Sequence, residues 1–198
     1  SCTWIWRMTA TLDFFLQLDR DIFIFLNSLH APWADTLMYW FTNKYTWIPM
    51  YVFLLWVTIK NEKRRSIAIV VTVLSAVIIA DKITSGVMKP YFMRLRPCHD
   101  PTLDGIINVV GGCGGLYGFA SSHASTSFSL AIVWYTLLKN KVSHMGWLLI
   151  WAACYSYSRI YVAAHYPGDI LVGAVVGLLS GWVCIKLYRT FLEKYYPN

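Results

Sequence analysis

The sequence predicts an all-α protein, a polytopic bundle of transmembrane helices that forms one domain over residues 1–198. Of its 198 residues, 57% are hydrophobic and only 14% are charged, which is typical of small membrane proteins. Ten Trp and thirteen Tyr suit the two membrane surfaces. The net charge of +7 comes from basic residues between apolar runs, so it indicates membrane topology rather than nucleic-acid binding.

Five segments have the composition to cross a bilayer, which takes about 20 apolar residues. In chain order they are 45–60, 66–88, 118–138, 145–164 and 168–188. The first segment is short and can borrow length from aromatic residues just upstream. We therefore expect residues 45–198 to form the transmembrane core.

Residues 11–44 precede this core and mix charged, aromatic and aliphatic side chains. Asp13, Asp19, Arg20 and Asp21 interrupt its apolar pattern. Such a segment is expected to form an N-terminal interfacial helix that lies along the membrane surface. The alternative is a sixth, imperfect crossing.

If the five spans alternate across the membrane, their connections sort by charge. The basic connections at 60–66 and 139–141 and the tail from Lys186 onward share one side. The positive-inside rule makes that side cytoplasmic and places the C-terminus there. The 89–118 connection and the 165–169 turn then lie on the opposite side, facing the periplasm or cell exterior of a bacterial inner membrane.

Basic residues on that outer side run against the rule and need another explanation. They are Lys89, Arg94, Arg96 and Arg159. Cations gathered at a membrane face indicate an anionic ligand, and phosphate is the one expected. The third span also begins on this side, with ASSH at 120–123, and a helix start favours an anion.

The serines of this motif have three possible roles. Ser121 and Ser122 are natural N-cap residues, and in that position they also point at a bound phosphate. A serine nucleophile with His123 as its base is the alternative. Plain helix capping, without any ligand, is the third.

A second histidine on the outer side has a carboxylate within reach. Asp169 follows His165 by four residues across a Pro-Gly turn, and a carboxylate there fixes the imidazole tautomer and strengthens the nucleophile. Asp169 also begins a line of small residues, Gly173, Gly177 and Gly181. We expect this stripe to pack on another helix and to turn Asp169 inward.

Three motifs occur in order: Lys89, six residues, then Arg96-Pro97; Ser121 and His123 in ASSH; and Ser158-Arg159, five residues, His165, three residues, Asp169. In order and spacing they resemble the type 2 phosphatidic acid phosphatase (PAP2) superfamily of integral membrane lipid phosphatases. The resemblance covers the chain from Lys89 to Asp169. The second motif departs from the family, which usually reads Pro-Ser-Gly-His, because Ala120 and Ser122 replace the Pro and the Gly.

The resemblance implies a mechanism without metal or cofactor. His165 attacks phosphorus and forms a phosphohistidine, Asp169 orients it, and His123 acts as general acid and then general base. The phosphate is neutralised by cations and hydroxyls, and these residues are Lys89, Arg96, Ser121, Ser122 and Arg159.

Two finer expectations concern residues near this site. Lys82 lies seven residues before Lys89, so we expect both on one helix face, with Lys82 extending the anion site and Asp81 holding a basic neighbour. Cys98 and Cys113 lie in the outer loop, and a disulfide between them would close this loop over the site.

The predicted function is that of a membrane lipid phosphatase acting on a lipid phosphate or diphosphate in the outer leaflet. Undecaprenyl diphosphate or lipid A is the favoured substrate, and phosphatidylglycerophosphate or phosphatidate is the alternative. Two non-enzymatic alternatives are an anion transporter and a phosphatase-like protein that binds lipid without turnover.

Overall fold

The computed structural model describes residues 2–195 and the side chains of residues 11–192. All regular elements within this part of the chain are helical, which confirms the predicted all-α class. The α-helices are α1 (Cys2–Ser28), α2 (Pro32–Thr42), α3 (Ile48–Glu62), α4 (Ser66–Asp81), α5 (Lys89–Phe92), α6 (Ser122–Leu138), α7 (Trp147–Tyr161) and α8 (Pro167–Tyr195). A π-helix, Lys82–Met88, joins α4 to α5.

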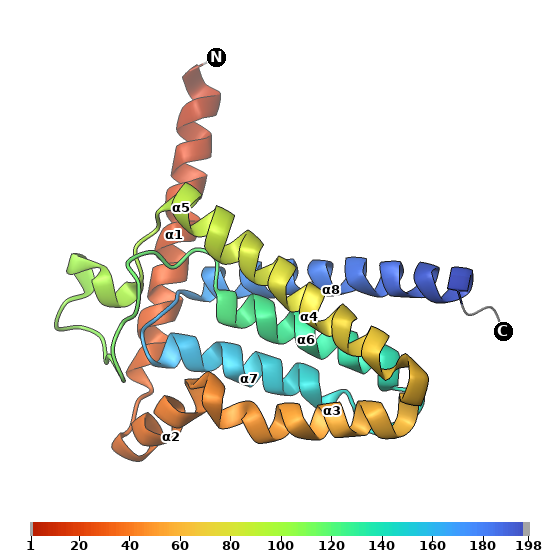
Figure 1. Cartoon of the computed structure of the whole chain (residues 1–198). Helices are drawn as coiled ribbons and strands as arrows, with labels where there is room; N and C mark the ends of the chain where they lie inside the picture. Colours follow the sequence, from red (N-terminus) through yellow and green to blue (C-terminus); the bar gives the residue numbers. More distant parts are fainter. Residues whose placement is uncertain (1, 196–198) are drawn as a thin grey trace.

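The long helices form a bundle with α6 at its centre. Figure 1 shows α3, α4, α6, α7 and α8 extending in the same general direction, while α1 crosses one end of them at a steep angle. Helix α6 packs along α8 and also against α4 and α7. Apolar side chains of these helices and of α3, among them Leu54, Ile69, Val133 and Leu148, are buried in one core, which stabilises the bundle by removing this surface from solvent.

Helices α6 and α8 approach closely because α8 presents glycines to α6. A Cβ atom on Gly173 would overlap the Ser121 carbonyl, and one on Gly177 would overlap the Ser125 carbonyl. The predicted packing of the glycine stripe is confirmed. This close packing fixes the first turn of α8 against the start of α6. Asp169 in that turn is fully buried, as expected.

The five predicted crossings are only partly matched. Two stretches of the described chain, Lys44–Phe92 and Pro167–Leu192, are long and apolar enough to span a membrane. The first of them turns back at Lys63, so α3 and α4 form a hairpin (Figure 1). Helices α6 and α7 have 17 and 15 residues and fall short of that length, so five spans are not confirmed.

The N-terminal region contains two helices rather than one. Helix α1 ends at Ser28, and α2 begins at Pro32, whose fixed φ and missing N–H suit the first turn of a new helix. Helix α1 packs on α7 and α8 at the end of the bundle where both approach the 162–166 connection.

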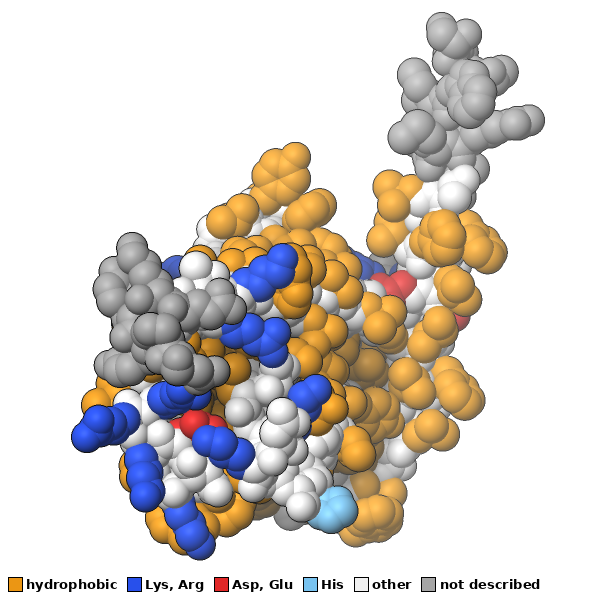
Figure 2. Space-filling view, turned by 90° about the vertical axis from the view of Figure 1, so that its right-hand side faces the viewer, with side chains coloured by type: hydrophobic (Ala, Val, Ile, Leu, Met, Phe, Trp, Pro, Cys, Tyr) orange, Lys and Arg blue, Asp and Glu red, His pale blue; other side chains and the backbone are white. Residues whose placement is uncertain are grey.

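The opposite end of the bundle carries the basic connections. Figure 2 shows Lys and Arg side chains gathered at this end, with hydrophobic side chains on the flanks around them. The two connections meet there, because Lys141 Nζ lies 3.0 Å from a Glu62 carboxylate oxygen. The molecule thus has one strongly basic end and, at the other, the residues predicted to form the site.

Candidate active site

The predicted site residues come from five helices and from the connections between them, which meet at one end of the bundle. Helices α6 and α8 begin there, α7 ends there, and the π-helix and α5 arrive from α4 (Figure 1). The long connection 93–121 covers this end. The structure therefore brings together three motifs that are spread over about 80 residues of sequence.

His165 and Asp169 form a buried pair. Their side chains are 1% and 0% exposed, and His165 Nδ1 lies 3.4 Å from Asp169 Oδ2. The same oxygen accepts a 3.1 Å hydrogen bond from the Tyr166 backbone N–H. His165 Nε2 lies 3.3 Å from Arg96 Nη1, and because a guanidinium only donates, Nε2 must be the unprotonated nitrogen. The lone pair of His165 Nε2 therefore points at the guanidinium group of Arg96.

The absence of a side chain at Gly118 lets the backbone of the Gly-rich segment pass close to the His165–Asp169 pair. A Cβ atom at this position would lie 3.1 Å from Asp169 Oδ2 and 3.5 Å from His165 Nδ1. The Gly118 backbone N–H donates to the Arg94 carbonyl at 2.8 Å, which ties the Gly-rich segment to the segment that carries Arg96. A side chain here would press on the buried carboxylate and on the Arg96 side chain, whose Cγ would lie 3.2 Å from the new Cβ.

Two arginines near His165 have unused hydrogen-bond donors. Arg96 is 8% exposed and its Nη1 donates to the Ala164 carbonyl at 3.2 Å. Arg159 Nη1 donates to Thr42 Oγ1 at 2.8 Å. Among the described residues, Nε of each arginine is buried without a hydrogen-bond partner. Buried donors are nearly always paired, so these N–H groups fit a site that takes up an anion.

The environment of His165 keeps its imidazole neutral. Burial lowers the pKa of His165 well below its ordinary value, and the positive charges of Arg96, Arg159 and Lys89 lower it further. A neutral imidazole has the free lone pair that a nucleophile requires. The same cations that would attract a phosphate thus also favour the neutral form of His165.

The first turn of α6 assigns its two serines different roles. Ser121 is the N-cap, and its Oγ accepts a 3.4 Å hydrogen bond from the Ala124 N–H. Ser122 does not cap the helix, because it is the first helical residue; its Oγ accepts a 2.7 Å hydrogen bond from Lys89 Nζ. His123 follows, half-buried, with its ring centroid 5.5 Å from that of Tyr155.

The expected contribution of Lys82 is not seen. Its side chain is exposed, whereas Lys89 is half-buried and bonded to Ser122. The seven-residue spacing fails as a guide because residues 82–88 form a π-helix, in which the number of residues per turn exceeds 3.6. Asp81 accepts a 3.0 Å hydrogen bond from Ser85 Oγ rather than one from a basic side chain, and its negative charge attracts the ammonium group of Lys89, the basic neighbour that was expected.

Ser85 completes a chain of hydrogen bonds that ends at Lys89. Its Oγ lies 2.7 Å from Ser122 Oγ. Because Ser85 donates to Asp81, it accepts from Ser122, and Ser122 in turn accepts from Lys89. Ser122, the residue that replaces the glycine of the family motif, therefore holds the ammonium group of Lys89.

Each partner of the Lys89–Ser122 hydrogen bond lines a cavity of its own. A cavity of about 510 Å³ is lined by His123, Ser122, Tyr155 and apolar side chains of α4 and α6. A cavity of about 490 Å³ on the other side is lined by Lys89, Arg96 and the Gly-rich loop. The first suits an apolar group and the second an anion.

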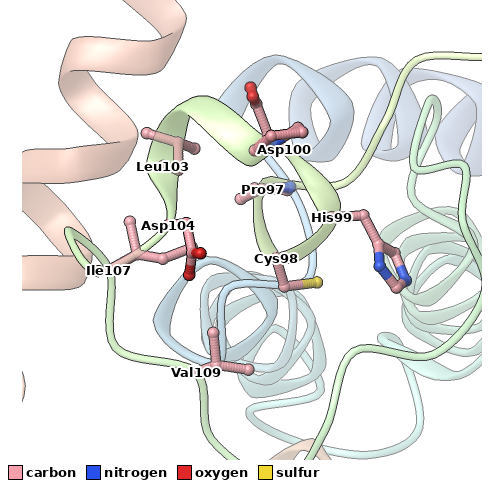
Figure 3. Close-up of a pocket in the computed structure, with 10 residues that line it drawn as sticks. Pro97, Cys98, His99, Asp100, Leu103, Asp104, Ile107 and Val109 are labelled. Atoms are coloured by element: carbon pink, nitrogen blue, oxygen red, sulfur yellow. The ribbon is translucent and has the colours of Figure 1, made fainter.

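A third pocket lies in the outer loop and has a different character. Figure 3 shows this pocket between Pro97 and Val109, with Asp100 and Asp104 among its lining residues; its volume is about 300 Å³. Carboxylates repel phosphate, so it does not extend the anion site. Cys98, also in the lining, is joined to Cys113 in a disulfide with Cα atoms 5.8 Å apart, which closes the 98–113 loop.

Comparison with known proteins identifies the family. Residues 68–193, which include all three motifs, match the PAP2 superfamily. The chain belongs to this superfamily. Over 181 residues the PAP2 chain is 36% identical to the lipid A 4'-phosphatase of Porphyromonas gingivalis, which covers 89% of this chain and 75% of that protein.

A second relative and a solved structure agree with this assignment. The PAP2 chain is 34% identical over 175 residues to the lipid A 4'-phosphatase of Bacteroides thetaiotaomicron, covering 87% of this chain and 77% of that one. Its fold resembles the crystal structure of Aquifex aeolicus LpxE with a TM-score of 0.66, covering 85% of this chain and 95% of that one at 22% identity. As a PAP2 lipid phosphatase, the protein is a hydrolase that acts on phosphoester bonds.

Three contacts of this PAP2 site were not predicted from the sequence. Arg94 contacts Asp169, Asp19 contacts Arg94, and Ser85 contacts Ser122. Charged residues amid apolar sequence are a signal of function in membrane proteins, and Asp19 and Arg94 both carried this signal. Ser85 has no such signal, since serine is common in membrane helices.

Proposed function

We propose that this PAP2 phosphatase removes a phosphate group from a lipid A-type lipid by way of a phosphohistidine at His165. The observation that carries the proposal is the buried His165–Asp169 pair, whose unprotonated Nε2 faces Arg96. His123 at the start of α6 and Lys89 supply the two other groups that the chemistry requires.

In the first step the Nε2 lone pair of His165 attacks phosphorus. The bond between phosphorus and the lipid oxygen breaks, and its electron pair stays on that oxygen, which takes a proton from His123. Asp169 stabilises the positive charge that develops on the His165 ring. Arg96, Arg159 and Lys89 neutralise the phosphoryl oxygens, which provides most of the catalysis that phosphoryl transfer needs.

In the second step the enzyme is restored. His123, now neutral, takes a proton from water as the water oxygen attacks phosphorus. The N–P bond breaks, its electron pair returns to His165 Nε2, and inorganic phosphate leaves. The two steps together hydrolyse one phosphoester bond: His165 forms and then releases the bond to phosphorus, while His123 gives a proton in the first step and takes one back in the second.

Two observations support a lipid as the substrate. The apolar cavity beside His123 lies where the leaving group would be, next to the proton donor. Two relatives with 34% and 36% identity are lipid A 4'-phosphatases, which supports lipid A over the polyprenyl diphosphate that the sequence favoured equally. We assign the monophosphate ester of lipid A as the preferred substrate class.

We also propose how the single PAP2 domain sits in a bacterial inner membrane. Five crossings, formed by α3, α4, α6, α7 and α8, place the site at the outer leaflet and the C-terminus in the cytoplasm. The basic end of the bundle shown in Figure 2 supports this orientation through the positive-inside rule. Helix α1, steeply inclined to the bundle, is then close to the membrane plane, as the interfacial region 11–44 requires.

The test is phosphate release by the purified full chain in detergent from lipid A, a polyprenyl diphosphate and phosphatidate, each compared with His165→Ala. We expect lipid A to give the highest kcat/KM and His165→Ala to release no phosphate. His144→Ala is the matched control, because this exposed histidine lies in the connection after α6, at the basic end.

Each remaining function predicts a different result. A transporter or a binding protein without turnover releases no phosphate from any lipid, and His165→Ala then makes no difference. Turnover of polyprenyl diphosphate but not lipid A would reject the substrate and keep the mechanism. Labelling with radioactive lipid phosphate should give an acid-labile phosphoprotein in the wild type and none in His165→Ala.

A further inference from the structure

We propose that Asp19 and Arg94 are positioning residues for Asp169, so that helix α1 completes the active site. This inference rests on the proposed function, in which His165 is the nucleophile and Asp169 orients it. Asp19 lies outside residues 68–193, the segment that matches the PAP2 superfamily. The proposal therefore extends the site to a helix beyond the matched region.

Arg94 bridges two carboxylates from different helices. Its Nη1 donates to Asp169 Oδ1 at 2.9 Å and its Nη2 donates to Asp19 Oδ2 at 2.7 Å. Its guanidinium carbon lies 4.0 Å from the centre of the Tyr166 ring, so the planar group is also held from one face. The Arg94 and Asp19 side chains are 22% and 14% exposed, and such shielded, charge-assisted hydrogen bonds are stronger than surface ion pairs.

Asp19 also holds the beginning of α8. Its Oδ1 accepts a 2.6 Å hydrogen bond from the Gly168 N–H, one of the free donors in the first turn of that helix. A Cβ atom on Gly168 would lie only 2.9 Å from Asp19 Oδ2, so the glycine makes room for the carboxylate. A single side chain from α1 thus contacts the residue next to Asp169 and the arginine that binds Asp169.

The bridge decides which oxygen of Asp169 faces the histidine. Arg94 occupies Oδ1, and Oδ2 is left for His165 Nδ1 at 3.4 Å and the Tyr166 N–H at 3.1 Å. A fully buried carboxylate without a partner is costly, and Arg94 supplies the counter-charge. Without Arg94, Asp169 would lose both its counter-charge and the contact that fixes its rotation.

Helix α1 has other contacts that keep it in place without Asp19. Phe23 is fully buried, with its ring 5.3 Å from that of Tyr166, and Asn27 Nδ2 donates to the Tyr161 carbonyl at 2.8 Å. Arg20 donates to the Thr102 carbonyl at 3.0 Å. Removing the Asp19 charge should therefore leave α1 docked, which separates positioning from folding.

The experiment measures kcat and KM for lipid A with Asp19→Asn, Arg94→Gln and the double variant, alongside their melting temperatures in detergent. We expect each single variant to lower kcat about 10- to 100-fold, as the loss of one charge-assisted hydrogen bond would, with KM changed less than about threefold. The double variant should be hardly slower than Arg94→Gln, because both residues act through one network. Arg94→Lys should recover part of the loss.

Arg20→Gln is the matched control, since it removes a neighbouring charge on α1 that binds a loop carbonyl outside the network. It should keep kcat within about threefold of the wild type, well short of the loss in the network variants. The proposal is overturned if Asp19→Asn keeps wild-type kcat or changes only KM. It is also overturned if the fold-loss of kcat in the double variant equals the product of the two single-variant losses. A wild type that releases phosphate from no lipid would overturn the proposed function, and this inference with it.

Discussion

Replacing Asp169 by Asn tests the proposed roles of His165 most directly. The substitution keeps the shape of the side chain and removes one acceptor oxygen. In the structure, Oδ1 accepts from Arg94 at 2.9 Å, and Oδ2 accepts from the Tyr166 N–H at 3.1 Å and faces His165 Nδ1 at 3.4 Å. An amide cannot meet all three groups, because one of its two positions is a donor.

The size of the effect follows from the two orientations that the new amide can take in the Asp169→Asn variant. With the NH₂ group toward His165, the ring must accept at Nδ1 and carry its proton on Nε2, which removes the nucleophilic lone pair. With the NH₂ group toward Arg94, two donors face each other and a charge-assisted hydrogen bond worth about 1.5–3 kcal/mol is lost. A wrong histidine tautomer lowers kcat by about 10⁴ in a serine protease, so we expect a loss of about 10³ to 10⁴ here.

The assay is release of phosphate from lipid A, with the melting temperature of each variant measured in the same detergent. The control is Asp35→Asn, because Asp35 also accepts from two groups, Tyr161 Oη at 2.7 Å and Asn108 Nδ2 at 3.2 Å, yet lies apart from His165. It should lose some stability and keep kcat within about threefold, since the amide oxygen can still accept both hydrogen bonds without the charge of the carboxylate, and neither partner sets the tautomer of His165. A folded Asp169→Asn variant that keeps a tenth of wild-type kcat would refute the reasoning.

Three further predictions concern Ser122, the glycine stripe and the charge of His165. Ser122→Gly frees Lys89 from its 2.7 Å hydrogen bond and so leaves its ammonium group available to phosphate. The Ki for inhibition by inorganic phosphate should therefore fall about 2- to 10-fold. Gly177→Ala should destabilise the bundle by about 1–3 kcal/mol in thermal melts, whereas Gly86→Ala, with nothing within 4 Å of its new Cβ, should not. Because burial lowers the pKa of His165, this residue should contribute a fall in stability of up to about 1.4 kcal/mol per pH unit as pH drops below about 6.5, and His165→Gln should remove that contribution from the slope.

Much of the site was predictable because its residues come in motifs with fixed spacing. Four residues across a Pro-Gly turn bring Asp169 within reach of His165. The glycine stripe predicted close helix packing because the absence of side chains is itself visible in sequence. Hydrophobic runs likewise predicted the helices, although α6 and α7 are shorter than the runs suggested.

Expectations that depended on regular helix geometry were less secure. The same-face argument for Lys82 and Lys89 assumed 3.6 residues per turn, and the π-helix between them has more. Treating both serines as caps overlooked that a helix has one N-cap, which is Ser121; Ser122 is the first helical residue and binds Lys89 instead. The first error arises because the 3.6-residue period does not hold through the π-helix, and the second because the exact first residue of α6 is not encoded in the motif.

The sequence alone determined the helical class, the family and the set of charged residues at one end of the bundle, because each rests on composition or short-range spacing. Only the tertiary structure decided which of those charges touch. Asp19 and Gly168 are 149 residues apart, and Arg94 is 75 residues from each carboxylate that it bridges. No local pattern encodes such a meeting, because it depends on how α1 packs across the starts of helices that follow much later in the chain.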